Sequence, residues 1–158
     1  LALAIHEARG GARHPAVAEI FVNLGASDFE RGRYAEADAW YRRAFSIDSA
    51  FYGVQHFRTA ATLVMRGRTL LRLEEFDAAE RLLKQAHAVQ RATFGDRHPR
   101  VASILNELGN GAITRQAYDS ADAYFTRMAA VYRAANGDAH FTVAVALSNR
   151  ATVYTEQG

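Results

Sequence analysis

The stretch GARHPAVAEIFVNLG, residues 11–25, decides the fold of this chain, and it returns at residues 95–109 as GDRHPRVASILNELG. Proline after His14 suits the first position of a helix, where no backbone hydrogen bond is lost and φ is already set. Val17, Phe21 and Leu24 then follow at helical spacing. Each stretch therefore predicts a helix that begins at a His-Pro pair and carries one apolar face.

The spacing of these stretches reveals a repeat of 42 residues. Glycine recurs at Gly11, Gly53, Gly95 and Gly137, histidine at His14, His56, His98 and His140, and a second glycine at Gly25, Gly67 and Gly109. We divide the chain into three full copies (residues 11–52, 53–94 and 95–136), the first helix of a fourth (137–158) and the end of a preceding one (1–10). We therefore expect a fragment of a longer repeat array that forms one domain.

A second period of 84 residues overlies the first. The odd copies carry His-Pro, whereas the even copies carry His-Phe at His56-Phe57 and His140-Phe141. The even copies also place Arg66 and Arg150 where the odd copies have leucine. This pattern indicates that a two-copy unit was duplicated.

A second helix is expected in each copy, starting near Tyr34 in the first. Its apolar positions recur at i, i+3, i+4 and i+7: Ala37, Trp40, Tyr41, Ala44, Phe45 and Ile47. Gly32 would end the preceding helix, with Glu74 and Gln116 at that place in the next two copies. One helix pair cannot bury its apolar face alone, so neighbouring pairs should stack into an all-α solenoid of about seven helices. Gly25, Gly67 and Gly109 should lie where two helices approach closely.

The pattern resembles the tetratricopeptide repeat, and its G-x-x-H-P lead-in resembles the longer variant of kinesin light chains. The positions that match the family signature in copy one are Phe21, Leu24, Gly25, Gly32, Tyr34, Ala37, Tyr41 and Ala44. The resemblance covers the whole chain and implies a right-handed superhelix of antiparallel helix pairs. It also implies that the concave surface, lined by first helices, binds a peptide or a partner protein.

Composition excludes several classes of function. The 158 residues are 49% apolar and 23% charged, with a net charge of +2 and no cysteine. We therefore expect no disulfide framework, no thiolate metal site, no nucleic-acid partner and no membrane partner. No signal core and no apolar run of membrane length occur, so we expect a cytoplasmic protein. Lys84 is the only lysine in an arginine-rich chain, which favours a bacterial source.

No catalytic, metal or cofactor motif stands out. The four histidines in register should be structural, because equivalent positions in stacked helices are roughly 10 Å apart and cannot share one zinc ion. His6 and His87 lie outside that column, and we expect them on the surface. Gly109-Asn110-Gly111 falls within a helix by register, so it is no phosphate loop.

The candidate binding residues are those that the register places on the groove. They are Val22, Phe29, Val64, Arg68, Leu71, Asn106, Asn110, Ile113, Ser148 and Thr152, with Glu19, Ala26 and Ala61 beside them. Asn106 and Asn110 offer amides that suit an extended backbone, and Arg68 could hold a carboxylate. Replacing both asparagines by alanine should leave stability unchanged and abolish binding. Val22 and Ala26 stand where relatives that clamp a carboxylate tail carry lysine and asparagine.

The sequence therefore predicts a non-catalytic scaffold that binds a peptide or a partner protein in the concave groove, as part of a larger, bacterial protein. The alternative is a self-assembling or spacer segment of a longer array attached to a catalytic or signalling domain, such as a serine/threonine kinase or a transcriptional regulator. End-to-end self-association is compatible with either.

Overall fold

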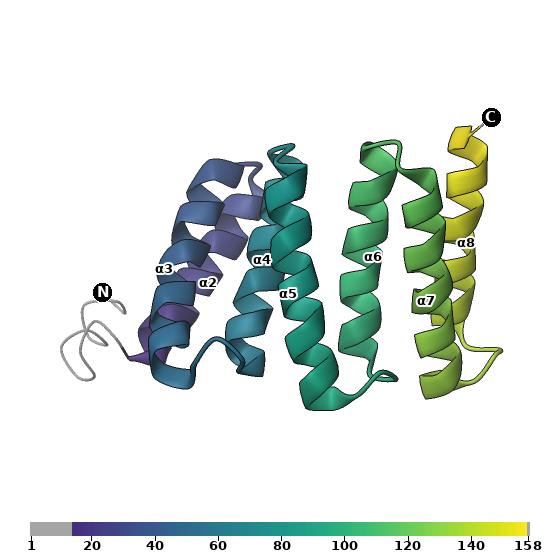
Figure 1. The fold of residues 1–158 in the computed structure, drawn as a ribbon. Coiled ribbons are helices and arrows are strands. Elements are labelled where there is room, and N and C mark those ends of the chain that lie inside the picture. Colours follow the sequence, from purple (N-terminus) through teal and green to yellow (C-terminus); the bar gives the residue numbers. More distant parts are fainter. Residues whose placement is uncertain (1–13, 158) are drawn as a thin grey trace. The chain divides into compact units, whose positions relative to one another are not determined.

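A computed structural model describes residues 14–157, which form helices joined by short loops (Figure 1). Shorter first helices alternate with second helices of 19 residues. The bounds are α2 Pro15–Glu30, α3 Tyr34–Tyr52, α4 Phe57–Arg72, α5 Phe76–Phe94, α6 Pro99–Thr114, α7 Tyr118–Asn136 and α8 Phe141–Gln157. The all-α class and the helix-pair repeat are confirmed. The expected end of a preceding repeat, residues 1–10, and His6 lie outside the described residues.

Each first helix begins after a histidine that satisfies one of its unpaired backbone donors. The imidazole Nδ1 accepts a hydrogen bond from the N–H two residues ahead, over 3.2 Å in His14, 3.2 Å in His56, 3.1 Å in His98 and 3.3 Å in His140. An N-cap acceptor of this kind typically contributes about 1 kcal/mol. Pro15 and Pro99 follow two of these caps at the start of the helix.

The first helices end in left-handed backbone. Gly32 closes α2 with φ of 74°, whereas Glu74 and Gln116 close α4 and α6 with φ of 62° and 59°. Glycine tolerates this region, but a residue with a Cβ is strained there. The second helices end at Gly53, Gly95 and Gly137, whose φ values lie between 84° and 87°.

Glycine also allows the two helices of a repeat to approach closely. A Cβ built on Gly25 would lie 2.7 Å from the Tyr41 ring, and one on Gly67 would lie 2.6 Å from Leu83 Cγ. A Cβ on Gly109 would lie 2.5 Å from the Phe125 ring. Each of these contacts is shorter than van der Waals packing permits, so the repeated glycine sets the helix–helix distance.

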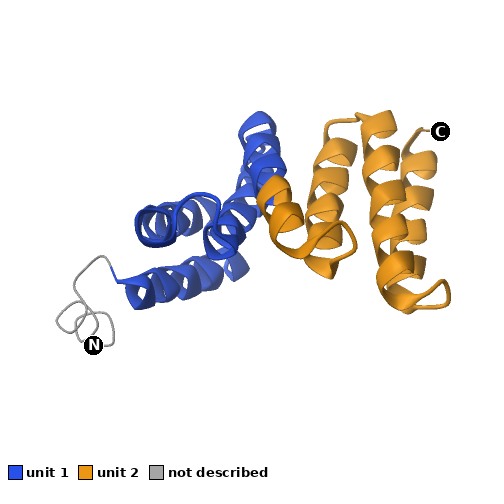
Figure 2. Ribbon diagram, turned by 60° about the horizontal axis from the view of Figure 1, so that its bottom comes forward, with its two compact units in different colours: residues 1–86 blue, residues 87–158 orange. Residues whose placement is uncertain are grey.

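The chain divides into two compact units, residues 1–86 and 87–158 (Figure 2). In the first unit, Phe21 of α2 stacks on Trp40 of α3 with ring centroids 5.5 Å apart. Val17 and Ala18 pack with them against Ala44 of α3. The core of the second unit joins α6, α7 and α8 through Val101, Leu105, Phe125, Met128, Ala146 and Val153. Between residues 14 and 157, none of the helices has both the length and the apolar character needed to cross a membrane.

Two ion pairs between consecutive helices repeat with the 84-residue period. In the first unit, Arg66 Nε of α4 donates to Asp38 of α3 over 3.0 Å, and Asp38 is only 4% exposed. In the second unit, Arg150 Nε of α8 donates to Asp122 of α7 over 2.7 Å. Both partners of the second pair stand 84 residues after those of the first. The arginine of the even copies therefore has its carboxylate partner on the preceding second helix.

Candidate functional site

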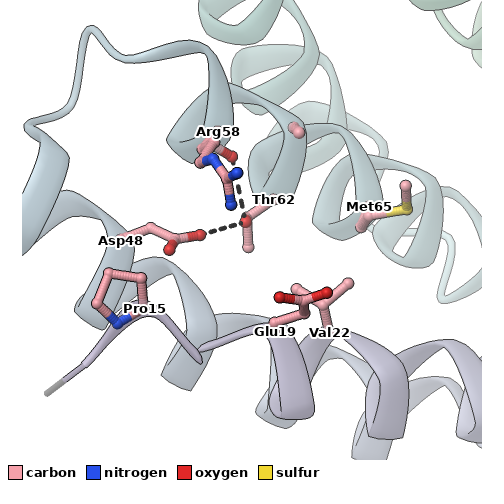
Figure 3. Close-up of a pocket in the computed structure, with 8 residues that line it drawn as sticks. Pro15, Glu19, Val22, Asp48, Arg58, Thr62 and Met65 are labelled. Atoms are coloured by element: carbon pink, nitrogen blue, oxygen red, sulfur yellow. Dashed lines mark hydrogen bonds between the residues drawn. The ribbon is translucent and has the colours of Figure 1, made fainter. Parts of the chain in front are cut away.

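A hollow of about 230 Å³ opens between α2 and α4 of the first unit (Figure 3). Glu19 and Val22 border it from α2, and Met65 borders it from α4. Asp48 of α3 and Thr62 of α4 also line it and point toward each other in Figure 3. Apolar and charged groups therefore share one concave site that three helices build. The complete lining is Pro15, Glu19, Val22, Asp48, Arg58, Ala61, Thr62 and Met65.

Asp48 is a charged residue in a buried position. Its side chain is held by Thr62, whose Oγ1 donates a hydrogen bond to Asp48 Oδ2 over 3.0 Å, and the residue is 7% exposed. Burial raises the pKa of Asp48, against the opposing effects of the Thr62 hydrogen bond and of Arg58 and His56. Its carboxylate therefore destabilises the folded state at neutral pH relative to acid, where it is protonated. A cation placed in the hollow would relieve that penalty.

The expected groove residues of the first unit remain accessible. Val22 lines the hollow, with Glu19 and Ala61 beside it. The Arg68 guanidinium, expected to hold a carboxylate, lies over the Phe29 ring at 5.4 Å from its centroid. The set of Val22, Phe29, Val64, Arg68 and Leu71 is partly buried throughout, so none belongs to the closed core.

The expected groove residues of the second unit differ in exposure. Asn106 Oδ1 accepts a hydrogen bond from Asn149 Nδ2 of α8 over 2.7 Å. Replacing Asn106 by alanine would break this bond between helices, so Asn110 is the cleaner probe of binding. Ile113 packs against the core of the unit. Asn110, Ser148 and Thr152 are exposed.

Sequence reasoning missed the polar residues of the hollow and Asn149. Asp48 could have been found, because it follows Tyr41 and Ala44 at i+7 and i+4 and so stands on the apolar face of its helix. A carboxylate on such a face points to a buried polar contact. The contribution of Thr62 depends on how α3 and α4 pack, and helical register within one element does not reveal it.

His87, which lies outside the column of N-cap histidines, is more buried than the sequence predicted. His87 is not a surface group: it is half-buried, and its Nε2 is buried without a hydrogen-bond partner among the described residues. It stands at position i+4 from Leu83, on the inward side of α5. Within residues 14–157, no three His, Asp or Glu side chains are grouped closely enough to hold a metal ion.

Comparisons with known proteins agree with this architecture. The family model described as tetratricopeptide repeat matches residues 1–50, 17–92 and 58–134. The structure is similar to BtubC (BKLC) from P. vanneervenii, with a TM-score of 0.82 and 22% identity over 92% of this chain. It is also similar to two crystal structures of nearly identical kinesin light chain TPR-like repeats from Podosopora anserina. Their TM-scores are 0.84 and 0.83, at 18% identity over 99% of this chain.

These likenesses show the fold alone. The chain spans 58% of the BtubC chain and 74% of each Podosopora anserina chain. No curated protein matches it in sequence. The family model matches repeatedly over most of the length of this chain. Together with the helix pairs just described, this match establishes that the chain belongs to the tetratricopeptide repeat family.

Proposed function

We propose that this chain is a non-catalytic protein-interaction module that binds an extended segment of a partner protein on its first helices. The hollow between α2 and α4 is the observation that carries this proposal. Most of its lining comes from α2 and α4, the helices that the register assigns to the groove, and α3 adds Asp48, which accepts a hydrogen bond from Thr62. The family membership supports the same reading, because tetratricopeptide repeats commonly serve as interaction scaffolds.

The size of the hollow fits one side chain rather than a metabolite. Its volume of about 230 Å³ is below the roughly 300–1,000 Å³ that small-molecule sites occupy. Val22, Ala61 and Met65 supply apolar contacts for the stem of such a side chain. The rest of the bound segment would lie along the accessible residues of α2 and α4, such as Val64 and Leu71.

The charge of the hollow indicates which side chain it takes. Its lining contains two carboxylates, of Asp48 and Glu19, and one guanidinium, of Arg58. A lysine or arginine of the partner would place its cation beside the buried Asp48 carboxylate and its methylene groups against Met65. Charge-assisted hydrogen bonds of this kind are roughly twice as strong as neutral ones.

Selection from a random peptide library displayed on phage tests the proposal. We expect the wild-type chain to enrich peptides that share a basic residue. Ala61→Arg fills the hollow and adds a like charge, so it should weaken the enriched peptides at least tenfold in fluorescence polarisation. Asp48→Asn keeps the shape of the site and should weaken peptides that carry the basic residue more than their alanine-substituted forms.

The matched control is Ala123→Arg, the same substitution at an exposed position of α7. It should leave the affinity of every enriched peptide within twofold of wild type. An Ala61→Arg chain that binds as tightly as the Ala123→Arg chain would overturn the proposal, and so would a library that yields no peptide above background.

A second candidate function, self-association, is favoured by the surface of α8. Leu147 is 41% exposed, although its counterparts Leu105 and Leu63, one and two repeats earlier, are each 1% exposed. Phe141 and Tyr154 of the same helix are also exposed. A second copy of the chain could cover these side chains. The cytoplasmic location, the bacterial source and an attached catalytic or signalling domain stay predictions of the sequence.

A further inference from the structure

A second cavity, of about 370 Å³, lies wholly within the second unit. The C-terminal half of α5 provides His87 and Arg91, and the following loop provides Asp96 and Arg97. Arg127 closes it from α7. The walls from α6 and α7 are apolar and include Val101, Leu105 and Val131. The cavity thus combines a basic rim with an apolar interior.

The rim has more positive charge than its own carboxylate can balance. Arg91 pairs with Asp96, and its Nη2 donates to Asp96 Oδ2 over 3.3 Å. Arg97 and Arg127 have no carboxylate within ion-pair distance in the part of the chain that the structure describes. Two guanidinium groups therefore border the cavity without an anion.

His87 leaves a hydrogen-bonding atom unused at the same place. Its Nε2 is buried and has no partner among residues 14–157. Leaving a buried polar atom unsatisfied destabilises a fold, so such an atom in a native protein needs an explanation. Burial lowers the pKa of His87, and Arg127 and Arg91 lower it further against a smaller opposing effect of Asp96.

The repeat fold does not require these side chains. Phe45 and Ala129 occupy the position of His87 one repeat earlier and one repeat later. Gln55 and Ala139 likewise occupy the position of Arg97. An apolar residue thus serves where His87 stands, and a neutral one serves where Arg97 stands. The histidine and the arginine are specific to this cavity, which points to a role other than packing.

We propose that this cavity is a docking site for an acidic segment of a partner protein, one of whose glutamate or aspartate carboxylates binds Arg97 and Arg127 and accepts a hydrogen bond from His87 Nε2. The methylene groups of that side chain would contact Val101 and Leu105. Arginine is well suited to such a role, because its planar fork matches a carboxylate. The site shares no residue with the α2/α4 hollow, so either proposal can fail without the other.

Occupation of the site should couple to the protonation of His87. The charged groups that face it are Arg91 from α5, Asp96 and Arg97 from the loop, and Arg127 from α7, whereas α6 contributes only apolar residues. In the free protein, burial together with Arg127 and Arg91 lowers the His87 pKa and so favours the neutral imidazole. A bound carboxylate favours the charged form, so it raises the His87 pKa and binding should strengthen as the pH falls from 8 to 6.

Two capped heptapeptides provide the probe, one with three glutamates among leucine and alanine and the other with glutamine in their place. We expect the glutamate peptide, titrated by calorimetry at pH 6.5, to bind at least tenfold tighter than the glutamine peptide. Arg97→Gln combined with Arg127→Gln should abolish that preference. Arg81→Gln, at an exposed position of α5 outside the cavity, is the matched control and should change the affinity by less than twofold.

His87→Phe copies the residue of the first repeat and should remain folded while it removes the pH dependence of binding. Proton NMR of the His87 ring should show its pKa rise when the glutamate peptide is added. Equal binding of the two peptides, unchanged affinity in the double arginine variant, or a His87 pKa that does not move would each overturn the proposal. So would inorganic phosphate that displaces the peptide at lower concentration than free peptide does, because the cavity would then be a phosphate site.

Discussion

At the scale of single residues, Glu74 and Gln116 occupy turn positions whose backbone conformation suits glycine better. Both end a first helix in left-handed backbone, the conformation that Gly32 adopts at the equivalent place in the first repeat. A residue with a Cβ is disfavoured in left-handed backbone by roughly 1–2 kcal/mol relative to glycine. Glycine in turn loses more conformational entropy on folding, which offsets about 0.5–1 kcal/mol of that difference.

Glu74→Gly and Gln116→Gly should therefore each stabilise the protein by about 0.5–1 kcal/mol. For a chain of this length such a gain raises the melting temperature by roughly 1–4 °C, which circular dichroism at 222 nm resolves. Gly32→Ala is the converse control and should lower it. If glycine at residue 74 or 116 lowers the melting temperature, the turn is held by the side chain and not by its backbone.

The ion pairs between consecutive helices act at the scale of elements. Asp38 of α3 accepts from Arg66 of α4 and from Arg42 of its own helix, whose Nε lies 2.6 Å from Oδ2. The Arg66 side chain is 16% exposed and that of Arg42 is 62% exposed. A buried pair loses far more when one partner is removed than an exposed pair does, because a desolvated charge is left behind.

Arg66→Leu, which introduces the residue of the odd copies, should lower the free energy of unfolding by about 2–3 kcal/mol. Arg42→Leu removes the other partner of the same carboxylate and should change it by less than about 1 kcal/mol. Urea unfolding of both variants, and of Arg66→Leu with Asp38→Ala, gives the comparison. We expect the double variant to recover part of the loss. Equal losses in the two single variants would mean that burial does not distinguish the two pairs.

The starts and ends of the helices were predictable from the sequence. The polar side-chain contacts between helices were less predictable. Helix starts followed from proline and histidine, and helix ends from glycine, because these residues act on their own backbone. The site residues that the sequence missed, Asp48, Thr62 and Asn149, make contacts across different helices. Asp48 meets Thr62, and Asn149 meets Asn106, which was an expected groove residue. His87 was misplaced for the same reason, since its neighbours come from α6 and α7 and the loop before α6.

At the scale of the whole molecule, the same repeated helix pair carries two candidate sites of opposite charge. The hollow of the first unit carries an excess of carboxylate, whereas the cavity of the second unit carries an excess of guanidinium. The residues that hold the repeat together are the histidine caps and the glycines between helices. Because these leave the intervening surface positions free to vary, each unit can acquire its own binding chemistry without a change of fold.

Self-association is the prediction that concerns the molecule as a whole, and substitution of Leu147 tests it. If a second copy covers α8, burying that leucine contributes about 1.5–3 kcal/mol, so Leu147→Glu should weaken association at least tenfold. Sedimentation velocity from 1 to 100 µM should show the wild type growing in size with concentration and the variant remaining a single chain. Val54→Glu, the same type of change at an exposed residue of the α3–α4 loop, should behave as wild type. A wild-type chain that sediments as a monomer throughout would leave peptide binding as the function to pursue, because no second copy would then cover α8.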